Sequence, residues 1–421
     1  MDIVRPRGTN DFLPQDTEKW HYLEHILREL CVEFGYGEIR TPLFEDTNLF
    51  QRGVGDTTDI VQKEMYTFTD QGDRSLTLRP EGTASVVRAY VENKLYGEVQ
   101  PTKVYYMGPM FRYERPQAGR YRQFHQFGIE CFGSNHPSAD GEVIALAWEF
   151  YKRLGLKGLE VSINSVGCSK CRPHYREMLQ EYLRPHLSHM CKSCQDRFEK
   201  NPLRILDCKN PECKEHSHSA PNTVDCLCTE CREHFAAVCD YLEQAGIPYR
   251  IDHRLVRGLD YYTKTAFEIL VDTIGAQSAI CGGGRYDGLV SQLGGPETPG
   301  VGFAMGIERV LVALAQQNIE LPVGRHTHVY IASLGREGDL KAFRILQALR
   351  ANHISAEKDL IGRSLKAQMK YADKLHADYV VLLGEEELKQ NICMVRKMGN
   401  SEQYPVALEN IVTYLTEQLK K

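Results

Sequence analysis

The sequence lacks any apolar run long enough to cross a bilayer. Its longest such runs, for example VLVALA at 310–315, have six residues, whereas a membrane-spanning helix needs about 20. The opening stretch MDIVRPRGTNDFLP also lacks the apolar segment that follows the basic start of a secretory signal. We therefore expect a cytoplasmic protein with no membrane partner.

The common nucleotide-binding loops are also missing. Glycines crowd GGGR (282–285) and GVGFAMGIER (300–309), but neither stretch has the Walker spacing with its terminal Lys-Ser/Thr or a dinucleotide-binding pattern. Both stretches fall where strands are predicted, and glycine weakens a strand. We interpret these glycines as places where a ligand or a neighbouring backbone approaches closely.

The composition is that of an ordinary globular protein. The chain has 421 residues, of which 42% are hydrophobic and 25% are charged, so it is long enough for two or three domains. The net charge of −5 argues neither for nor against a nucleic-acid partner, because such binding depends on local patches.

Hydrophobic periodicity predicts an α/β protein. Apolar residues at helical spacing predict a helix over 17–36 with Thr17 as N-cap, and a second helix over 137–156. Strands are predicted at 75–83, 103–114, 122–133 and 257–271, with a hairpin loop, RPQAGRY, between the second and third. Beyond residue 325, strands alternate with helices, which predicts a small α/β domain with a largely parallel sheet and a final helix at 405–419.

The predicted hairpin carries polar and aromatic groups that suit a nucleotide. Arg112 offers a bidentate guanidinium for phosphate, and Phe124 offers a ring for stacking on a base. Gln126 and Glu130 share the strand face of Phe124, and a carboxylate facing a pocket suits a substrate with N–H donors. The alternative is a solvated, charged hairpin.

Two further segments carry candidate groups. In LRPEGT (78–83), Glu81 and Thr83 offer a carboxylate and a hydroxyl for an α-ammonium group, although Glu81 equally suits the first turn of a helix. RGLDYYTKTAFE (257–268) begins with Arg257 and carries two tyrosines, which ordinary strand propensity also explains.

Cysteines are concentrated in one region. Nine of the 14 fall between residues 168 and 231, and pairs at such spacing in a cytosolic protein indicate metal rather than disulfides. Thiolates from two such pairs suit one tetrahedral Zn²⁺, so we expect one or two structural zinc ions. The alternatives are small buried hydrophobic residues or a redox role, which usually accompanies a thioredoxin-like βαβ pattern absent here. The predicted ligands are Cys168, Cys171, Cys191, Cys194, Cys208, Cys213, Cys228 and Cys231.

Several motifs together resemble those of one enzyme family. FRYERPQAGRYRQFHQFGIE (111–130) and GFAMGIERV (302–310) look like motifs 2 and 3 of class II aminoacyl-tRNA synthetases, and 34–50 is similar to motif 1, the dimer-interface segment. RGLDYYTKTAFE and GGGRYDGL resemble the two signatures of the histidyl-tRNA synthetase family.

The resemblance implies a fold and a domain organisation. It implies a class II catalytic domain on a mixed, mainly antiparallel sheet, formed by residues 1–167 and 256–320. Residues 168–255 would form a helical, cysteine-rich insertion, and residues 325–421 an α/β anticodon-binding domain. The family likeness also implies a homodimer.

The resemblance further implies substrates and residue roles. The substrates would be ATP with Mg²⁺, L-histidine and tRNA(His), joined in two steps through histidyl-adenylate. Arg112 and Arg257 would be catalytic. Histidine would contact Glu81, Thr83, Gln126, Glu130, Tyr261 and Tyr262. ATP would contact Arg112, Glu114, Phe124 and Arg309, and the tRNA acceptor end would contact Gln117.

Two rival functions remain. A non-catalytic paralogue would act as the regulatory subunit of a histidine-biosynthesis enzyme, but such proteins typically lack the C-terminal domain and catalytic residues that are present here. A class II synthetase for another amino acid would not be expected to carry the Gln126 and Glu130 pair.

Overall fold

The computed structural model describes residues 3–55, 58–272, 279–324 and 327–420. These residues form two compact units; the larger includes Trp20–Leu321 and the smaller includes the described residues from Pro322 onward. The predicted start of the C-terminal domain, Arg325, lies outside the described residues. Among the described helices, none is both long and apolar enough to cross a membrane.

An eight-stranded sheet forms the centre of the larger unit. Its strand order is β1-β5-β6-β11-β10-β9-β7-β8, and the outer pairs β1/β5 and β7/β8 are parallel while every other pair is antiparallel. The predicted mixed, mainly antiparallel sheet is therefore confirmed. The strands are β1 Gly37–Glu38, β5 Thr102–Phe111, β6 Gln123–Phe132, β7 Leu159–Ser165, β8 Tyr249–Ile251, β9 Thr263–Val271, β10 Ala279–Arg285 and β11 Gly300–Gly306.

The predicted hairpin is the β5/β6 pair. Its register runs from Thr102 opposite Phe132 to Phe111 opposite Gln123. The connecting loop turns at Gly119, whose φ of 71° is one that glycine adopts readily. The alternation of the two strands therefore predicted both the pairing and the loop.

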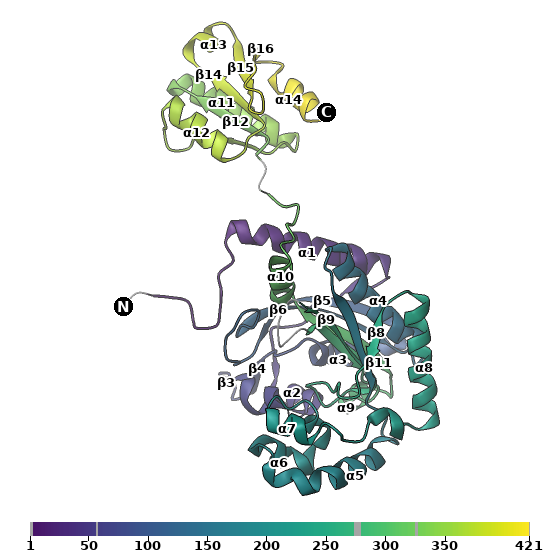
Figure 1. Cartoon of the computed structure of the whole chain (residues 1–421). Helices are drawn as coiled ribbons and strands as arrows, with labels where there is room; N and C mark the ends of the chain where they lie inside the picture. The colour runs from purple at the N-terminus through teal and green to yellow at the C-terminus, as the bar shows by residue number, and fades with distance from the viewer. Residues whose placement is uncertain (1–2, 56–57, 273–278, 325–326, 421) are drawn as a thin grey trace. The chain divides into compact units, whose positions relative to one another are not determined.

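Helices cover the sheet and enclose its main core. Buried side chains of α1, α4 and α8 pack with those of the central strands in one cluster, and Figure 1 shows α4 beside α8. The helices of this unit are α1 Pro14–Glu33, α2 Thr47–Val54, α3 Thr83–Glu92, α4 Pro137–Arg153, α5 Arg172–Leu183, α6 Lys192–Lys200, α7 Pro211–His216, α8 Thr229–Gln244, α9 Leu289–Gln292 and α10 Ile307–Gln316. Shorter turns are the π-helical η1 Ile60–Glu64 and the 3₁₀ turns η2 Leu95–Gly97, η3 Arg184–His189, η4 Pro202–Ile205 and η5 Thr223–Cys226.

A small second sheet lies in the same unit. Its order is β2-β4-β3, from β2 Phe44–Asp46, β3 Tyr66–Thr69 and β4 Ser75–Leu78. β4 ends two residues before Pro80, and α3 begins at Thr83. The segment LRPEGT is thus the turn that connects a strand to a helix.

Part of the predicted insertion belongs to the main sheet. β8 pairs with β7, and α8 contributes buried residues to the main core. The short helices α5, α6 and α7 gather at one side of the unit instead (Figure 1). These contacts place the part of 168–255 that is separate from the sheet before α8.

The start of one helix and the start of one strand differ from the expectation. α1 begins at Pro14, because proline suits a first helical position, so Thr17 lies inside the first turn and its hydroxyl donates to the Pro14 carbonyl. The predicted strand at 257–271 begins only at Thr263, because the residues before it form a loop.

The smaller unit holds a five-stranded sheet in the order β13-β12-β14-β15-β16. β12 pairs in parallel with β13 and β14, whereas β14/β15 and β15/β16 are antiparallel, so the prediction of a largely parallel sheet was wrong. The predicted helix at 405–419 is also wrong at its start, because Pro405 lies in the edge strand β16, a position that proline tolerates. The elements are β12 Val329–Ser333, α11 Gly335–Ala351, β13 Ala356–Lys358, α12 Leu365–Lys374, β14 Tyr379–Leu383, α13 Glu385–Lys389, β15 Ile392–Lys397, β16 Gln403–Ala407 and α14 Ile411–Leu419.

Candidate active site

A cavity of about 440 Å³ opens over the main sheet, a volume typical of small-ligand sites. Its walls come from the turn before α3, the β5/β6 hairpin, the loop before β9, strands β9 to β11 and the start of α10. The predicted site residues that line it are Glu81, Thr83, Arg112, Glu114, Phe124, Gln126, Arg257, Tyr261, Tyr262 and Arg309. Segments far apart in the chain thus meet in one place.

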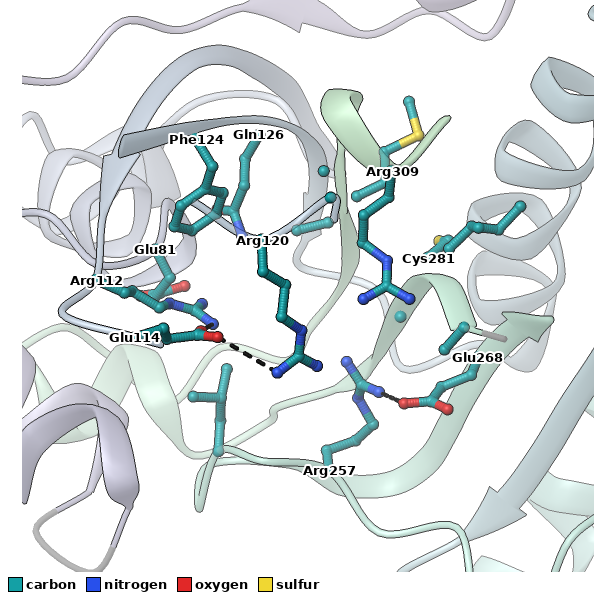
Figure 2. Close-up of a pocket in the computed structure, with 18 of the residues that line it drawn as sticks. Glu81, Arg112, Glu114, Arg120, Phe124, Gln126, Arg257, Glu268, Cys281 and Arg309 are labelled. Atoms are coloured by element: carbon teal, nitrogen blue, oxygen red, sulfur yellow. Dashed lines mark hydrogen bonds and ion pairs between the residues drawn. The ribbon is translucent and has the colours of Figure 1, made fainter. Parts of the chain in front are cut away.

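Guanidinium groups converge in this cavity. Figure 2 shows Arg120, Arg257 and Arg309 pointing into the same space from the hairpin, the loop before β9 and α10. Arg112 stands at the wall, where its Nε donates to the Pro80 carbonyl at 2.8 Å. A cluster of cations of this kind suits a polyphosphate.

The guanidinium of Arg112 lies beside an aromatic ring and a carboxylate of the hairpin. The Arg112 guanidinium lies 5.3 Å from the centre of the Phe124 ring. Glu114 accepts from Arg120 at 3.3 Å and lies 3.6 Å from Arg112. Sequence reasoning missed Arg120, because its position in the loop was typical of a solvent-exposed charge.

The Arg257 side chain packs against β10 at Gly282, a position that has no side chain. A Cβ at Gly282 would overlap the Arg257 guanidinium, so this glycine makes room for a side chain rather than for the ligand or backbone that the sequence predicted. Arg257 forms an ion pair with Glu268 on β9. Burial disfavours its charge, but the neighbouring Glu268 carboxylate holds the pKa of Arg257 above its ordinary value.

Glu81 stabilises the first turn of a helix, which is the alternative role that the sequence allowed. Its carboxylate accepts from the backbone N–H groups of Thr83 at 2.8 Å and Ala84 at 2.7 Å, at the start of α3. It lines the cavity as well. Burial raises the pKa of Glu81 above its ordinary value.

Glu130 lies at the margin of the cavity and does not line it. Its side chain is 1% exposed, and Tyr286 donates a hydrogen bond to its Oε2. Burial raises the pKa of Glu130 to about 8. A Cβ at Gly302 would overlap this carboxylate, which again explains a glycine in a strand.

Two buried acceptors on one face of β6 have no hydrogen-bond partner among the described residues. Gln126 Oε1 and Glu130 Oε1 have no hydrogen-bond partner within the described part of the chain. The two residues lie on the same face of β6, and Gln126 lines the cavity. Leaving buried acceptors unpaired costs about 1–3 kcal/mol each, so the site suits a ligand that donates N–H groups.

Three aromatic rings surround this polar pair. Tyr261 and Tyr262 line the cavity with ring centres 4.7 Å apart, and Tyr261 meets the Tyr286 ring edge-on at 5.7 Å. Both tyrosines stand in the loop before β9, so strand propensity does not explain them.

Gln117 lies outside the cavity. It is exposed in the hairpin turn, where its backbone exchanges hydrogen bonds with Arg120 at 3.1 and 2.8 Å. A group at this position is open to a macromolecule that approaches the cavity entrance.

Other residues at the site were missed by sequence reasoning. Glu308 on α10 accepts from the backbone N–H of His125 at 2.9 Å and contacts its Nδ1 at 3.0 Å, which ties α10 to β6. Asp207 and Lys209 line the cavity from the predicted insertion. The local sequence did not predict these residues, because their contacts with the site are made only when distant segments of the chain fold together.

The predicted cysteine ligands form two separate clusters. In each, four Sγ atoms lie within 4.8 Å of one another. One cluster contains Cys168, Cys171, Cys228 and Cys231, and the other contains Cys191, Cys194, Cys208 and Cys213. All of these thiols are free, and Cys226 belongs to neither cluster, since its Sγ contacts Met178 at 3.5 Å.

The fold and the cavity define the class of this protein. A mainly antiparallel sheet that carries arginines from a β5/β6 hairpin and from the start of α10 is the catalytic fold of a class II aminoacyl-tRNA synthetase. Residues 8–310 match the family model described as Histidyl-tRNA synthetase, and residues 328–418 match the one described as Anticodon binding domain. The chain belongs to the histidyl-tRNA synthetase family.

Individual relatives are similar to this chain over nearly its whole length. The chain is 61% identical to the histidine–tRNA ligase of Desulforamulus reducens, over 99% of both chains. It is 59% identical to that of Pelotomaculum thermopropionicum, over 100% of this chain and 99% of that protein. The crystal structure of apo S. aureus histidyl-tRNA synthetase superposes with a TM-score of 0.85 at 44% identity, covering 98% of this chain and 100% of that one.

Proposed function

We propose that this protein is a histidine–tRNA ligase that activates L-histidine with ATP and transfers it to the 3′ end of tRNA(His). The observation that carries the choice of histidine is the pair of buried acceptors, Gln126 Oε1 and Glu130 Oε1, which have no hydrogen-bond partner among the described residues. An imidazole ring is small, planar and aromatic, and it presents N–H to such acceptors.

In the first step, the histidine carboxylate attacks the α-phosphorus of ATP and pyrophosphate leaves. Negative charge develops on the α-phosphoryl oxygens, and fixed cations aimed at that charge lower the barrier. Arg112 and Arg257 supply these cations in our proposal. Arg112 is held by the Pro80 carbonyl and Arg257 by Glu268, so neither has to reorganise much during the reaction.

The remaining cavity residues bind ATP. Phe124 stacks on the adenine, Glu114 accepts from its amino edge, and Arg309 contacts the γ-phosphate end. Glu268, a second carboxylate that lines the cavity, would offer the oxygen ligands that Mg²⁺ prefers. When bound, Mg²⁺ neutralises charge on the β- and γ-phosphates.

Histidine is held at both of its ends. Glu81 and Thr83 bind the α-ammonium group, while Gln126, Glu130, Tyr261 and Tyr262 enclose the imidazole. A site with buried polar groups rejects analogues that leave those groups unpaired, by factors of about 10⁴ or more. Selectivity therefore needs no separate editing site.

In the second step, a terminal ribose hydroxyl of the tRNA attacks the adenylate carbonyl. Gln117, exposed in the hairpin turn, contacts the acceptor end, and the C-terminal unit binds the anticodon. The proposal keeps the predicted division into a catalytic domain, an insertion and an anticodon-binding domain, and a homodimer that forms through residues 34–50. It places the protein in the cytoplasm, and it includes structural zinc bound by the cysteines of the insertion.

Exchange of labelled pyrophosphate into ATP, measured with each of the twenty amino acids, tests the proposal. We expect exchange with histidine alone and subsequent transfer of histidine to tRNA(His). Exchange with another amino acid would identify a different class II synthetase. No exchange with any amino acid would favour the regulatory paralogue.

A further inference from the structure

The two cysteine clusters have the dimensions of metal sites. Sulfur atoms that share a tetrahedral Zn²⁺ at about 2.3 Å lie about 3.8 Å apart. The Sγ atom of Cys168 lies 3.6 Å from that of Cys171 and 3.9 Å from that of Cys228. The Sγ atoms of Cys191 and Cys208 are 3.8 Å apart. A disulfide would need about 2.05 Å, so the spacing fits thiolates around a shared ion.

Backbone N–H groups complete the surroundings of the thiolates. The Cys228 N–H donates to Cys171 Sγ, and the Cys191 N–H donates to Cys213 Sγ, both at 3.2 Å. Such donors orient metal ligands and stabilise their negative charge. Each cluster thus pairs four sulfurs with a donor from its own cysteine backbone.

The first cluster joins the two ends of the helical segment. Cys168 and Cys171 follow β7 and precede α5, whereas Cys228 is the N-cap of α8. These are the points where the chain leaves the main sheet and where it returns to pack on the main core. We call this cluster the end site.

The second cluster lies inside the segment, between very short elements. Cys191 and Cys194 begin α6, and Cys213 is in α7. These helices have nine and six residues, and helices shorter than about 12 residues are marginal without external support. We call this cluster the inner site.

The inner site is directly connected to the proposed active site. Its ligand Cys208 stands between Asp207 and Lys209, which both line the active-site cavity. The chain between its ligands Cys194 and Cys208 therefore ends in a wall of that cavity.

The same stretch of chain also holds the loop that carries Arg257. Asn201 Nδ2 donates to Asp260 Oδ1 at 2.8 Å, and the Arg204 guanidinium donates to the Arg257 carbonyl at 3.3 Å. Arg204 is 8% exposed and fixed in η4. Fixing Cys194 and Cys208 to one ion fixes the residues that support the arginine loop.

We propose that the protein binds two Zn²⁺ ions, one at the end site and one at the inner site, and that the inner ion positions the Arg257 loop and one wall of the cavity. Each ion replaces thiol protons, which pass to solvent. The catalytic half of this inference rests on the proposed function, whereas the division into two sites does not.

Metal content of the full-length protein, purified without chelator, tests the division. We expect about two zinc ions per chain in the wild type, because thiolate sites bind zinc tightly. The double variants Cys191→Ser/Cys208→Ser and Cys168→Ser/Cys228→Ser should each keep one ion, and the control Cys226→Ser should keep both. A wild type with one ion or none, or with disulfides in place of thiolates, would overturn the division.

A conservative pair of variants tests the positioning role. Cys208→His retains a Cys₃His ligand set that suits zinc, whereas Cys208→Ser removes one ligand. We expect Cys208→Ser to lose the inner ion and roughly 10- to 100-fold in kcat for histidine-dependent exchange, with a smaller change in KM, and Cys208→His to keep both ion and activity.

Hydrogen exchange at the Asp260 amide, which donates to the Val54 carbonyl at 3.2 Å, supplies a readout that is independent of activity. This amide should exchange faster in Cys208→Ser and at the wild-type rate in Cys208→His. A variant that loses the inner ion but keeps kcat and amide protection would refute the positioning role. A wild type with two ions but no histidine-dependent exchange would refute the proposed function and leave the two sites intact.

Discussion

Replacement of Glu130 by glutamine tests whether the buried carboxylate of β6 titrates as its surroundings indicate. Burial raises the pKa of Glu130 from 4.5 to about 8, although the hydrogen bond from Tyr286 acts in the opposite direction. In the unfolded chain the carboxyl group has its ordinary pKa of 4.5. The folded state therefore holds this proton more tightly than the unfolded state does.

The sign and size of the effect follow from that difference. A group whose pKa is raised on folding contributes stability that is fully present below its unfolded pKa and lost as pH rises through its folded pKa. The wild type should lose about 1.4 kcal/mol of unfolding free energy per pH unit, relative to the variant, between about pH 5 and 7.5. The interval from 4.5 to about 8 sets an upper limit of about 5 kcal/mol.

Urea unfolding of the ligand-free wild type and Glu130→Gln at about pH 5.5, 6.5 and 7.5 measures this difference. Protein concentration is held constant, and equal m-values show that both proteins expose the same surface on unfolding. The nearby Glu81 is present in both proteins, so its titration contributes to both curves. Parallel pH dependence in the two proteins would show that Glu130 is ionised in the folded state, contrary to this prediction.

Three further substitutions test separate contacts of the larger unit. Arg257→Lys keeps the charge but loses the planar fork, so kcat for histidine-dependent exchange should fall by about 10²–10³, and an unchanged kcat would contradict its role. Phe124→Ala should raise the KM for ATP by about 10-fold or more, because stacking on a base contributes about 1–3 kcal/mol. The control Phe124→Tyr keeps an aromatic ring and should leave this KM unchanged. Equal KM values for the two variants would exclude stacking. Asp140→Ala leaves the fully buried Arg285 without its main partner, which should cost about 3–5 kcal/mol in urea unfolding, and a loss below about 1 kcal/mol would show that the pair is not a stabilising contact.

Much of the fold was predictable from local patterns. The alternation in 103–114 and 122–133 predicted the β5/β6 hairpin, and α4 lies where helical spacing predicted it. Strand direction in the smaller unit was not predictable, because it depends on long-range pairing such as that of β14 with β15. The helix predicted from residue 405 failed because an edge strand accepts Pro405, whereas local periodicity does not distinguish the edge of a sheet from a helix start.

The candidate site was predictable where a motif marks it and obscure elsewhere. The motif residues gather in one cavity, apart from Glu130 at its margin and Gln117 outside. Arg120 and Glu268 were missed because their roles depend on partners that only the fold brings near. Cysteine spacing likewise predicted metal ligands but left the grouping open, since Cys168 and Cys228 of one cluster are 60 residues apart in the chain.

A crystal structure with a non-hydrolysable histidyl-adenylate analogue tests whether the cavity binds histidine and the α-phosphate as proposed. We expect the imidazole within hydrogen-bonding distance of Gln126 and Glu130, and the α-phosphate mimic within reach of both Arg112 and Arg257. An analogue bound with its imidazole away from Glu130, or with either arginine turned from the phosphate position, would contradict the proposal.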